Sequence, residues 1–187
     1  MSLNTQDLTV FGVDEAYFAL LLSDVKGTTR TYEELVRARA IQDLKITETA
    51  TEYTQPGDNG IVDVRGMTES YELEATLGFV NLELLGMIKG ATLTNEEDAE
   101  GNIIKTVISF KSDDLAPYVG FLGVVKSANY KIVLPKLKIT SFEIPYTNLT
   151  HSVVTIKGKA IKTDSDGEMY KLIQEKTLTE ATTADMA

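Results

Sequence analysis

Few side chains in this sequence have the types and spacing that catalysis requires. The single histidine, His151, follows the polar stretch 147–150, and neither a cysteine nor a Ser-His-Asp arrangement accompanies it. A general base needs positioned partners, so His151 is interpreted as a surface or loop residue. The sequence also lacks a Walker loop, a glycine-rich dinucleotide turn and zinc-ligand spacing. We therefore expect neither an enzyme nor a bound cofactor.

Two acidic clusters are candidate cation sites. Asp164 and Asp166 precede Gly167 as at the start of a calcium loop, but the other oxygen ligands and the closing glutamate are missing. An Asp-Gly hairpin turn is the better interpretation, and no metal site is expected. The run Glu96–Glu100 is interpreted as a solvated loop. The sequon Asn148-Leu149-Thr150 carries no meaning without secretion.

A further acidic pair, Glu72 and Glu74, lies in a segment that alternates between apolar and polar residues. Such alternation predicts a strand with one buried and one exposed face. The apolar set is Tyr71, Leu73, Ala75 and Leu77, and the polar set is Ser70, Glu72, Glu74 and Thr76. Two interpretations stay open: the glutamates simply face water, or they line a surface that is kept negative.

Composition limits the function further. A chain of 187 residues predicts one domain with a sizeable core. Its 28 acidic and 18 basic residues leave a net charge of −10, which argues against binding nucleic acid through phosphate contacts. Cysteine is absent, which excludes disulfides. Residues 1–10 lack the layout of a signal peptide, and no run of about 18 apolar residues is present, so folding in a cytoplasm is expected.

Turn signals divide the chain into short strands. Strands are predicted at 13–23, 41–53, 61–64, 69–77, 103–110, 118–125, 130–134, 136–144, 153–161 and 169–173. Pro135 should mark an edge or a bulge, and Asp58-Asn59-Gly60 a tight turn. The pattern predicts a mainly β fold, an antiparallel β-sandwich or partial barrel. Residues 1–10 are expected to form an N-terminal arm, 11–175 the sandwich domain, and 176–187 a C-terminal arm or mobile tail.

One short flanking α-helix is predicted at Leu82–Lys89. Asn81 is placed to cap its start and Gly90 to stop it. The helix is apolar nearly all round, so it should be buried on more than one side. We expect Leu82, Leu85 and Ile88 to pack in the core.

The order of these features resembles the major tail protein, or tail tube protein, of long-tailed bacteriophages that infect Gram-positive bacteria. The resemblance runs over nearly the whole chain and rests on shared order and spacing. The segments that carry it are Gly12-Val13-x-x-Ala16-Tyr17-Phe18-Ala19, Pro56-Gly57-Asp58-Asn59-Gly60, Tyr71-Glu72-Leu73-Glu74-Ala75, Leu84-Leu85-Gly86, Ala116-Pro117-Tyr118-Val119-Gly120-Phe121 and Asp166-Gly167-Glu168-Met169-Tyr170-Lys171.

The resemblance implies a virion protein whose hexameric rings stack into a hollow tube through which the genome leaves. Six copies that close into one multi-subunit β-barrel remove their sheet edges. Four strands from each copy, about 24 at roughly 4.8 Å spacing and 40° tilt, enclose a bore some 40 Å wide. The implied partners are other copies and the tape measure, distal tail and terminator proteins. Double-stranded DNA would pass without specific binding, no membrane is involved, and assembly would take place in the host cytoplasm.

Two sets of residues are assigned to this tube as expectations. An acidic lumen lets DNA slide, whereas a basic one would bind it. The residues expected to face the lumen are Glu72, Glu74, Asp63 and Glu48. The connection 28–40, predicted to form a brief helix or a projecting hairpin, is long for a compact domain and is therefore a candidate for function. The residues expected to contact the next ring or subunit are Tyr32, Leu35, Arg37 and Arg39.

Two other interpretations remain open. The inner tube of a contractile injection device shares the expected fold. A monomeric carbohydrate- or receptor-binding β-sandwich module would also suit the strands. Such modules usually present exposed aromatic platforms, and this chain has no tryptophan.

Overall fold

The computed structural model describes residues 12–57, 60–79, 81–145 and 153–187. Over these residues the chain is mainly antiparallel β with one short α-helix, as predicted. Its elements are β1 (Glu15–Ser23), β2 (Thr31–Tyr32), β3 (Val36–Ala38), β4 (Ile41–Gly57), β5 (Gly60–Leu77), α1 (Leu82–Lys89), β6 (Thr92–Glu97), β7 (Ile103–Ser109), β8 (Tyr118–Val125), η1 (Lys126–Ala128), β9 (Tyr130–Glu143), β10 (Val154–Ala160), β11 (Lys171–Gln174) and η2 (Thr183–Asp185). The expected N-terminal arm 1–10, the turn at Asp58-Asn59, the sequon and His151 lie outside the described residues.

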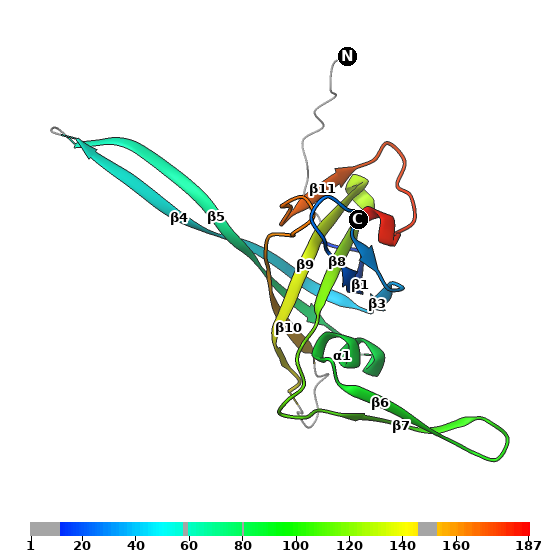
Figure 1. The fold of residues 1–187 in the computed structure, drawn as a ribbon. Helices are drawn as coiled ribbons and strands as arrows, with labels where there is room; N and C mark the ends of the chain where they lie inside the picture. The colour runs from blue at the N-terminus through cyan, green and yellow to red at the C-terminus, as the bar shows by residue number, and fades with distance from the viewer. Residues whose placement is uncertain (1–11, 58–59, 80, 146–152) are drawn as a thin grey trace.

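Nine strands form one sheet that bends through β9 (Figure 1). The order is β2-β1-β8-β9-β10-β5-β4, with β3 added to β1 and β11 added to β9, and these pairings are antiparallel. The first half of β9 pairs with β8 and β11, whereas its last part pairs with β10. The sheet therefore has two layers, which share β9. We call the last part of β9 with β10, β5 and β4 the ribbon, and the other strands the β1–β8 layer.

Strand β9 carries a bulge at its middle. Two of its residues, Pro135 and Lys136, face the single residue Gly120 of β8. Proline has no N–H to give to a ladder, and sheets tolerate it at bulges. The prediction for Pro135 is confirmed, although the strands expected on either side of it are one continuous strand.

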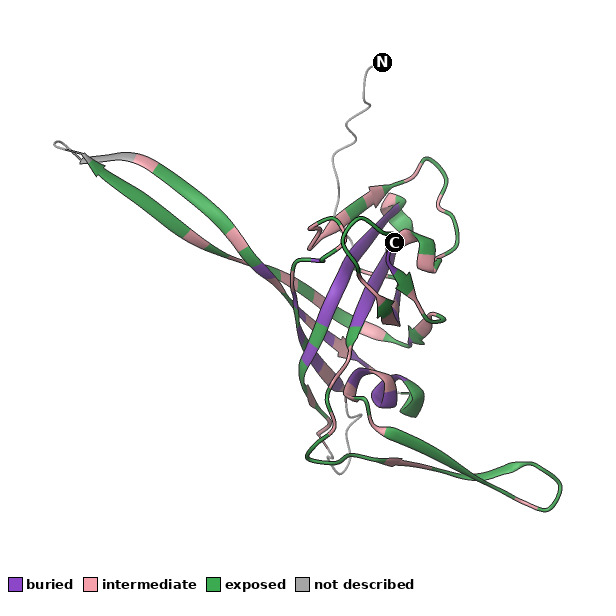
Figure 2. Cartoon of the chain, in the orientation of Figure 1, coloured by how far each residue is buried: buried purple, intermediate pink, exposed green. Residues whose placement is uncertain are grey.

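An apolar core fills the space between the two layers. Phe18 of β1 and Phe121 of β8 meet edge to face with ring centroids 5.2 Å apart, and Leu73 of β5 belongs to the same cluster. Fully burying such a side chain contributes about 1.5–3 kcal/mol to stability. The purple segments of Figure 2 accordingly follow β8, β9 and α1.

Helix α1 packs against this core and has the predicted bounds. The Asn81 side chain accepts the N–H of the second helical residue at 3.0 Å, and Gly90 takes the left-handed conformation at φ 66°. Leu85 and Ile88 are buried in the core. The expectation that Leu82 packs with them is wrong, because this first helical residue extends beyond the core and stays 40% exposed.

Two long hairpins project from the body in different directions (Figure 1). The distal part of β4–β5 and the whole of β6–β7 are two-stranded, and Figure 2 shows both largely exposed. Two expectations are corrected here. Strand β5 runs unbroken through 65–68, because β4 pairs with it along its whole length. Glu96 and Glu97 belong to β6 rather than to a loop, since a free hairpin tolerates charge on both faces.

Candidate assembly surfaces

The ribbon presents a polar face that its strands build in register. Glu74 of β5 lies opposite Lys45 of β4 and Lys157 of β10, and Glu72 lies opposite Lys159. Residues directly opposite each other in antiparallel strands point to the same face of a sheet. The Lys157 amine forms an ion pair with Glu74 Oε1 at 3.0 Å. Rows of mixed charge therefore cross this face.

Lysines balance the acids on the polar face of the ribbon. Among the described strand pairings, four lysines and four acids share it: Lys45, Lys138, Lys157 and Lys159 with Asp43, Glu72, Glu74 and Glu143. An anionic surface was one of the two interpretations of Glu72 and Glu74. The lysines stand on the neighbouring strands, so one strand's pattern could not reveal them. The face is close to neutral.

The four acids that were expected to line one wall do not share a face. Glu48 lies opposite Tyr71, so it points to the side of the ribbon away from Glu72. This separation follows from the two-residue period of a strand. Asp63 lies farther out on the hairpin, where it pairs with Arg65 at 2.9 Å. The expectation of one common wall is therefore wrong for Glu48.

Both hairpins expose large apolar side chains. Tyr53 and Met67 on β4–β5 are each 60% exposed, and Ile104 on β6–β7 is 65% exposed. Ile108 at the base of β6–β7 packs against the core, but the outer part of each hairpin is two-stranded with neither face covered, and such a pair of strands is marginally stable in water. Exposed apolar side chains on such hairpins are typical of a surface that another molecule covers. The hairpins are the second candidate surface.

The connection 28–40 folds back onto its own subunit as β2 and β3, which both pair with β1. The Tyr32 hydroxyl lies 2.9 Å from the carbonyl oxygen of Pro135 and 3.1 Å from that of Met186. Burial raises the pKa of Tyr32 to about 12. Leu35 packs against the apolar cluster that contains Met186. Both residues, expected at a ring contact, hold the C-terminus of their own chain.

Arg37 and Arg39, also expected to contact a neighbouring ring, have different surroundings. Arg37 pairs with Glu15 Oε1 at 3.0 Å, and Lys126 contacts the same oxygen at 2.8 Å. The hydrogen bond from Lys126 is the largest of the effects that hold the pKa of Glu15 below its usual value. Arg39 is exposed beside Phe79. Within the described ranges Arg39 forms no ion pair, and its contact with another ring stays a prediction.

The C-terminal residues 175–187, which we call the strap, dock on the outer face of the β1–β8 layer. Met186 is fully buried there among three apolar residues, Ala19, Leu122 and Val133. Gly120 makes room for it, because a Cβ at this position would come within 2.7 Å of Met186 Sδ. The strap covers the outer face of the β1–β8 layer, whereas the polar face of the ribbon stays open.

A fully buried lysine anchors the strap. The Lys131 amine lies 3.1 Å from Glu175 Oε1, 3.0 Å from Asp185 Oδ1 and 2.9 Å from Thr179 Oγ1, and its side chain is 0% exposed. These three acceptors all belong to the strap. A buried charge without partners is strongly unfavourable, so Lys131 and the strap stabilise each other.

A second buried cation joins the strap to the turn at 164–168. Arg30 Nε donates to the Met186 carbonyl at 3.1 Å. Its Nη1 pairs with Asp166 Oδ1 at 2.6 Å and its Nη2 with Glu168 Oε2 at 2.8 Å. The guanidinium therefore holds strap and turn together.

A third cation, Lys136, lies between Asp24 and Asp164, at 2.8 Å and 2.6 Å. Burial alone would raise the pKa of Asp24, but hydrogen bonds from the backbone of 164–165 and from Lys136 hold it far below its usual value. The carboxylates that resembled a calcium loop, Asp164 and Asp166, are thus engaged by cationic side chains. No group of acids, histidines or cysteines in the described part of the chain is placed to hold a metal.

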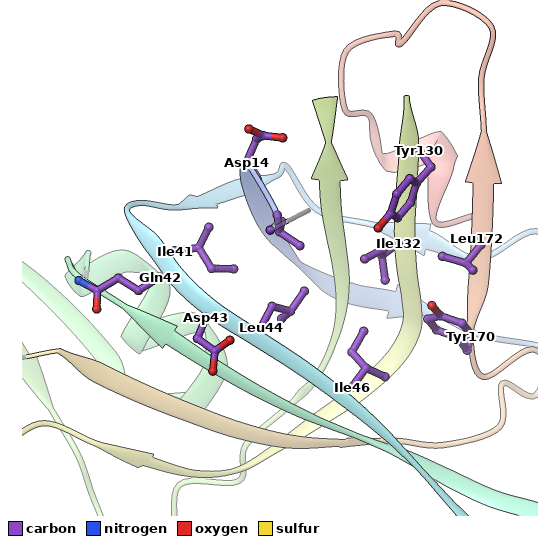
Figure 3. Close-up of a pocket in the computed structure, with 12 residues that line it drawn as sticks. Asp14, Ile41, Gln42, Asp43, Leu44, Ile46, Tyr130, Ile132, Tyr170 and Leu172 are labelled. Carbon is purple, nitrogen blue, oxygen red and sulfur yellow. The ribbon is translucent and has the colours of Figure 1, made fainter. Parts of the chain in front are cut away.

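An open cleft of about 590 Å³ lies between β4 and the first half of β9 (Figure 3). Its lining is largely apolar, from Ile41, Leu44 and Ile46 on one side and Tyr130, Ile132 and Tyr170 on the other. The cleft lies along the margin of the ribbon, where the partial barrel stays open. Within the described ranges, none of the helices has the length and apolarity to cross a bilayer.

The buried cations were not predicted from the sequence. Lys131 and Lys136 interrupt the otherwise apolar run 130–137, and a lysine inside such a strand is the signal that marks an internal ion pair. The partners could not be read in the same way. The acids that bind Lys131 lie 44 and 54 residues away in the chain.

Comparison with known proteins gives structural likenesses only. No family model and no curated protein matches the chain. One similar structure is a chain from the sheath–tube complex of an extracellular contractile injection system (PVC, extended state). Its TM-score is 0.44 and its sequence identity 11%, and the match covers 94% of this chain and 100% of that chain. A chain from the tube-terminating cap of the anti-feeding prophage has a TM-score of 0.42 and 11% sequence identity. A chain from the baseplate of the anti-feeding prophage has a TM-score of 0.40 and 10% sequence identity. They cover 94% of this chain and 100% and 99% of their own. Because these TM-scores lie below 0.5, function is inferred from the surfaces of the subunit itself.

Proposed function

We propose that this protein is a structural subunit whose copies form hexameric rings that stack into a phage-tail-like tube. The observation that carries the proposal is the ribbon, a four-stranded sheet with a core on one face and an open polar surface on the other. Six copies would supply 24 strands to a closed barrel with this surface as its inner wall. Closure would also remove exposed strand edges.

The hairpins support stacking of the rings. They project beyond the body and expose apolar side chains, including Met67 and Ile104, that the subunit itself does not cover. A contact made by one surface of a copy on a different surface of the next is heterologous, and such contacts build rings or open filaments. Arg39 remains a candidate for the same contact between rings.

Two assemblies fit these surfaces, and the charge of the inner wall distinguishes them. The tail tube of a long-tailed phage conducts DNA and would benefit from an anionic wall. The lysines of the ribbon make its polar face near neutral, which favours the second candidate, the inner tube of a contractile injection device. A wall of balanced charge suits cargo other than a polyanion.

Negative-stain electron microscopy and light scattering of the purified protein test the proposal. Rings or tubes are expected as the concentration rises. A matched variant joins Ala50 to Thr68 through an Asn-Gly turn, which removes the distal hairpin where those two residues pair. This variant should keep its thermal unfolding transition but stop at rings. A wild-type protein that stays a 20.5 kDa monomer at every concentration would overturn the proposal and favour a monomeric binding module.

A further inference from the structure

A bulge in β5 marks the point where the β4–β5 hairpin leaves the body. The pair Thr49–Ser70 is followed by the pair Ala50–Thr68, so Glu69 is an extra residue in its strand. Strand β10 pairs with β5 only on the body side of this bulge. A bulge bends its strand and increases the local twist, and two-stranded ribbons twist more than wide sheets. Beyond the bulge, the faces of the hairpin therefore turn out of the inward and outward directions of the ribbon.

The bulge also decides which side chains share a face of the hairpin. Residues directly opposite each other lie on one face, and successive residues alternate between faces. Tyr53 lies opposite Arg65, and Met67 lies opposite Thr51. Tyr53 and Met67 are therefore diagonal neighbours on one face, which we call the apolar face, and each is 60% exposed. Without the extra residue, the ladder would set Met67 opposite Glu52, on the other face.

The opposite face of the hairpin has a hollow at Gly66. This glycine lies opposite Glu52, and its neighbours on the same face of β5 are Val64 and Thr68. A Cβ at position 66 would meet no heavy atom of the described residues within 4 Å. Backbone is thus exposed between two side chains, with an exposed carboxylate beside it. We call this side of the hairpin the hollow face.

We propose that the hairpins of neighbouring copies in one ring stack into a collar, in which the apolar face of each hairpin covers the hollow face of the next. This inference rests on the proposed tube. A rotation about the ring axis keeps every residue at its height. Along the hairpin, Met67 and Tyr53 lie one pair to either side of Gly66. At equal height, these two side chains of one copy reach the hollow of its neighbour from both sides.

Charge and symmetry favour contact between unlike faces. Arg65 on the apolar face is 82% exposed and pairs there with Asp63, whereas the hollow face presents Glu52 beside Gly66. Stacking unlike faces brings the guanidinium toward the neighbour's Glu52. Such a contact is heterologous and can repeat around a ring, whereas a contact between two like faces ends at a pair of copies. The collar would be the surface that the next ring meets.

Filling the hollow tests the contact without removing any side chain. The backbone at Gly66 is not left-handed and the space around it is open, so Gly66→Val should fold and keep its thermal unfolding transition. The valine would take the place of the neighbour's side chains, so rings should form but tubes should need about tenfold more protein. Gly66→Ala should give a smaller shift. Thr54→Val, an isosteric change on the same face, should leave assembly unaltered.

A disulfide identifies the faces that meet, since the natural chain has no cysteine. Residues 66 and 67 point to opposite faces of the hairpin, so cysteines there cannot bridge within one extended strand. In assembled protein, the double variant Gly66→Cys/Met67→Cys should give an oxidised ladder of up to six chains on a denaturing gel. Each single variant should stay monomeric on the same gel.

Three results would overturn the collar. Dimers from Met67→Cys alone would mean that like faces meet. Tubes of Gly66→Val at the wild-type concentration, or assembled double variant without a ladder, would also contradict it and leave the proposed function standing. A wild type that forms neither rings nor tubes would overturn both.

Discussion

Replacing Lys131 with methionine should cost a large part of the stability that the strap contributes. The amine is 0% exposed and has three side-chain acceptors on the strap, so its loss leaves Glu175 and Asp185 close together without a cation. Removing one partner of a buried ion pair costs about 3–5 kcal/mol. Both carboxylates can regain water if the strap lifts, and the cost cannot exceed the free energy of strap docking. A value near 3 kcal/mol is therefore expected.

Urea unfolding followed by far-UV circular dichroism measures this loss. With a slope of about 2–3 kcal/mol per molar urea, the midpoint should fall by about 1–1.5 M. Lys157→Met is the matched control: its side chain is 54% exposed and its ion pair lies at the surface, so a change within about 0.5 kcal/mol is expected.

The decisive comparison is the same substitution in a chain shortened to residue 174. Without the strap, Lys131 is open to water, and Lys131→Met should cost little there. The two changes should therefore be strongly non-additive, as for groups in contact. An equal loss of stability with and without the strap would refute the idea that Lys131 acts by anchoring it.

Three further predictions concern other contacts. Gly120→Ala should displace Met186 and speed proteolysis of the strap, because the new Cβ would lie 2.7 Å from its sulfur; an unchanged cleavage rate would contradict this. Since the folded pKa of Asp24 is depressed, its contribution is present above the unfolded value of 3.8 and lost as the pH falls below it. Asp24→Asn should thus flatten the acid side of a stability–pH curve, and parallel curves would count against the contact with Lys136. In assembled tubes, Glu72→Lys with Glu74→Lys should create salt-sensitive retention of duplex DNA in a filter-binding assay without preventing assembly.

The sequence was sufficient for features that depend on neighbouring residues. Helix α1 has the predicted bounds because Asn81 and Gly90 act within a turn of its ends. The bulge at Pro135 was predictable for a similar reason, since a missing N–H is a property of the residue itself. Strands β2 and β3 are too short to show a period, and their positions depend on pairing with β1, which no local pattern indicates.

The charged surfaces were harder to predict, because they form between segments far apart in the chain. In its own strand Glu74 is compatible with an anionic face, but strand pairing places Lys45 and Lys157 beside it. The strap has a Thr- and Ala-rich composition that suggested mobility or docking on a partner. Its position depends on Arg30 and Lys131, which no local pattern connects to it.

The alternating directions of the ribbon strands also limit how such a subunit can change size. One added or deleted strand would make the first and last strands of the ribbon run in the same direction. The strands that meet between neighbouring copies of the proposed ring would then have to be parallel. Insertion or loss of a complete hairpin keeps the first and last strands of the ribbon running in opposite directions. Wider or narrower rings built on this plan should therefore differ by pairs of strands in each copy.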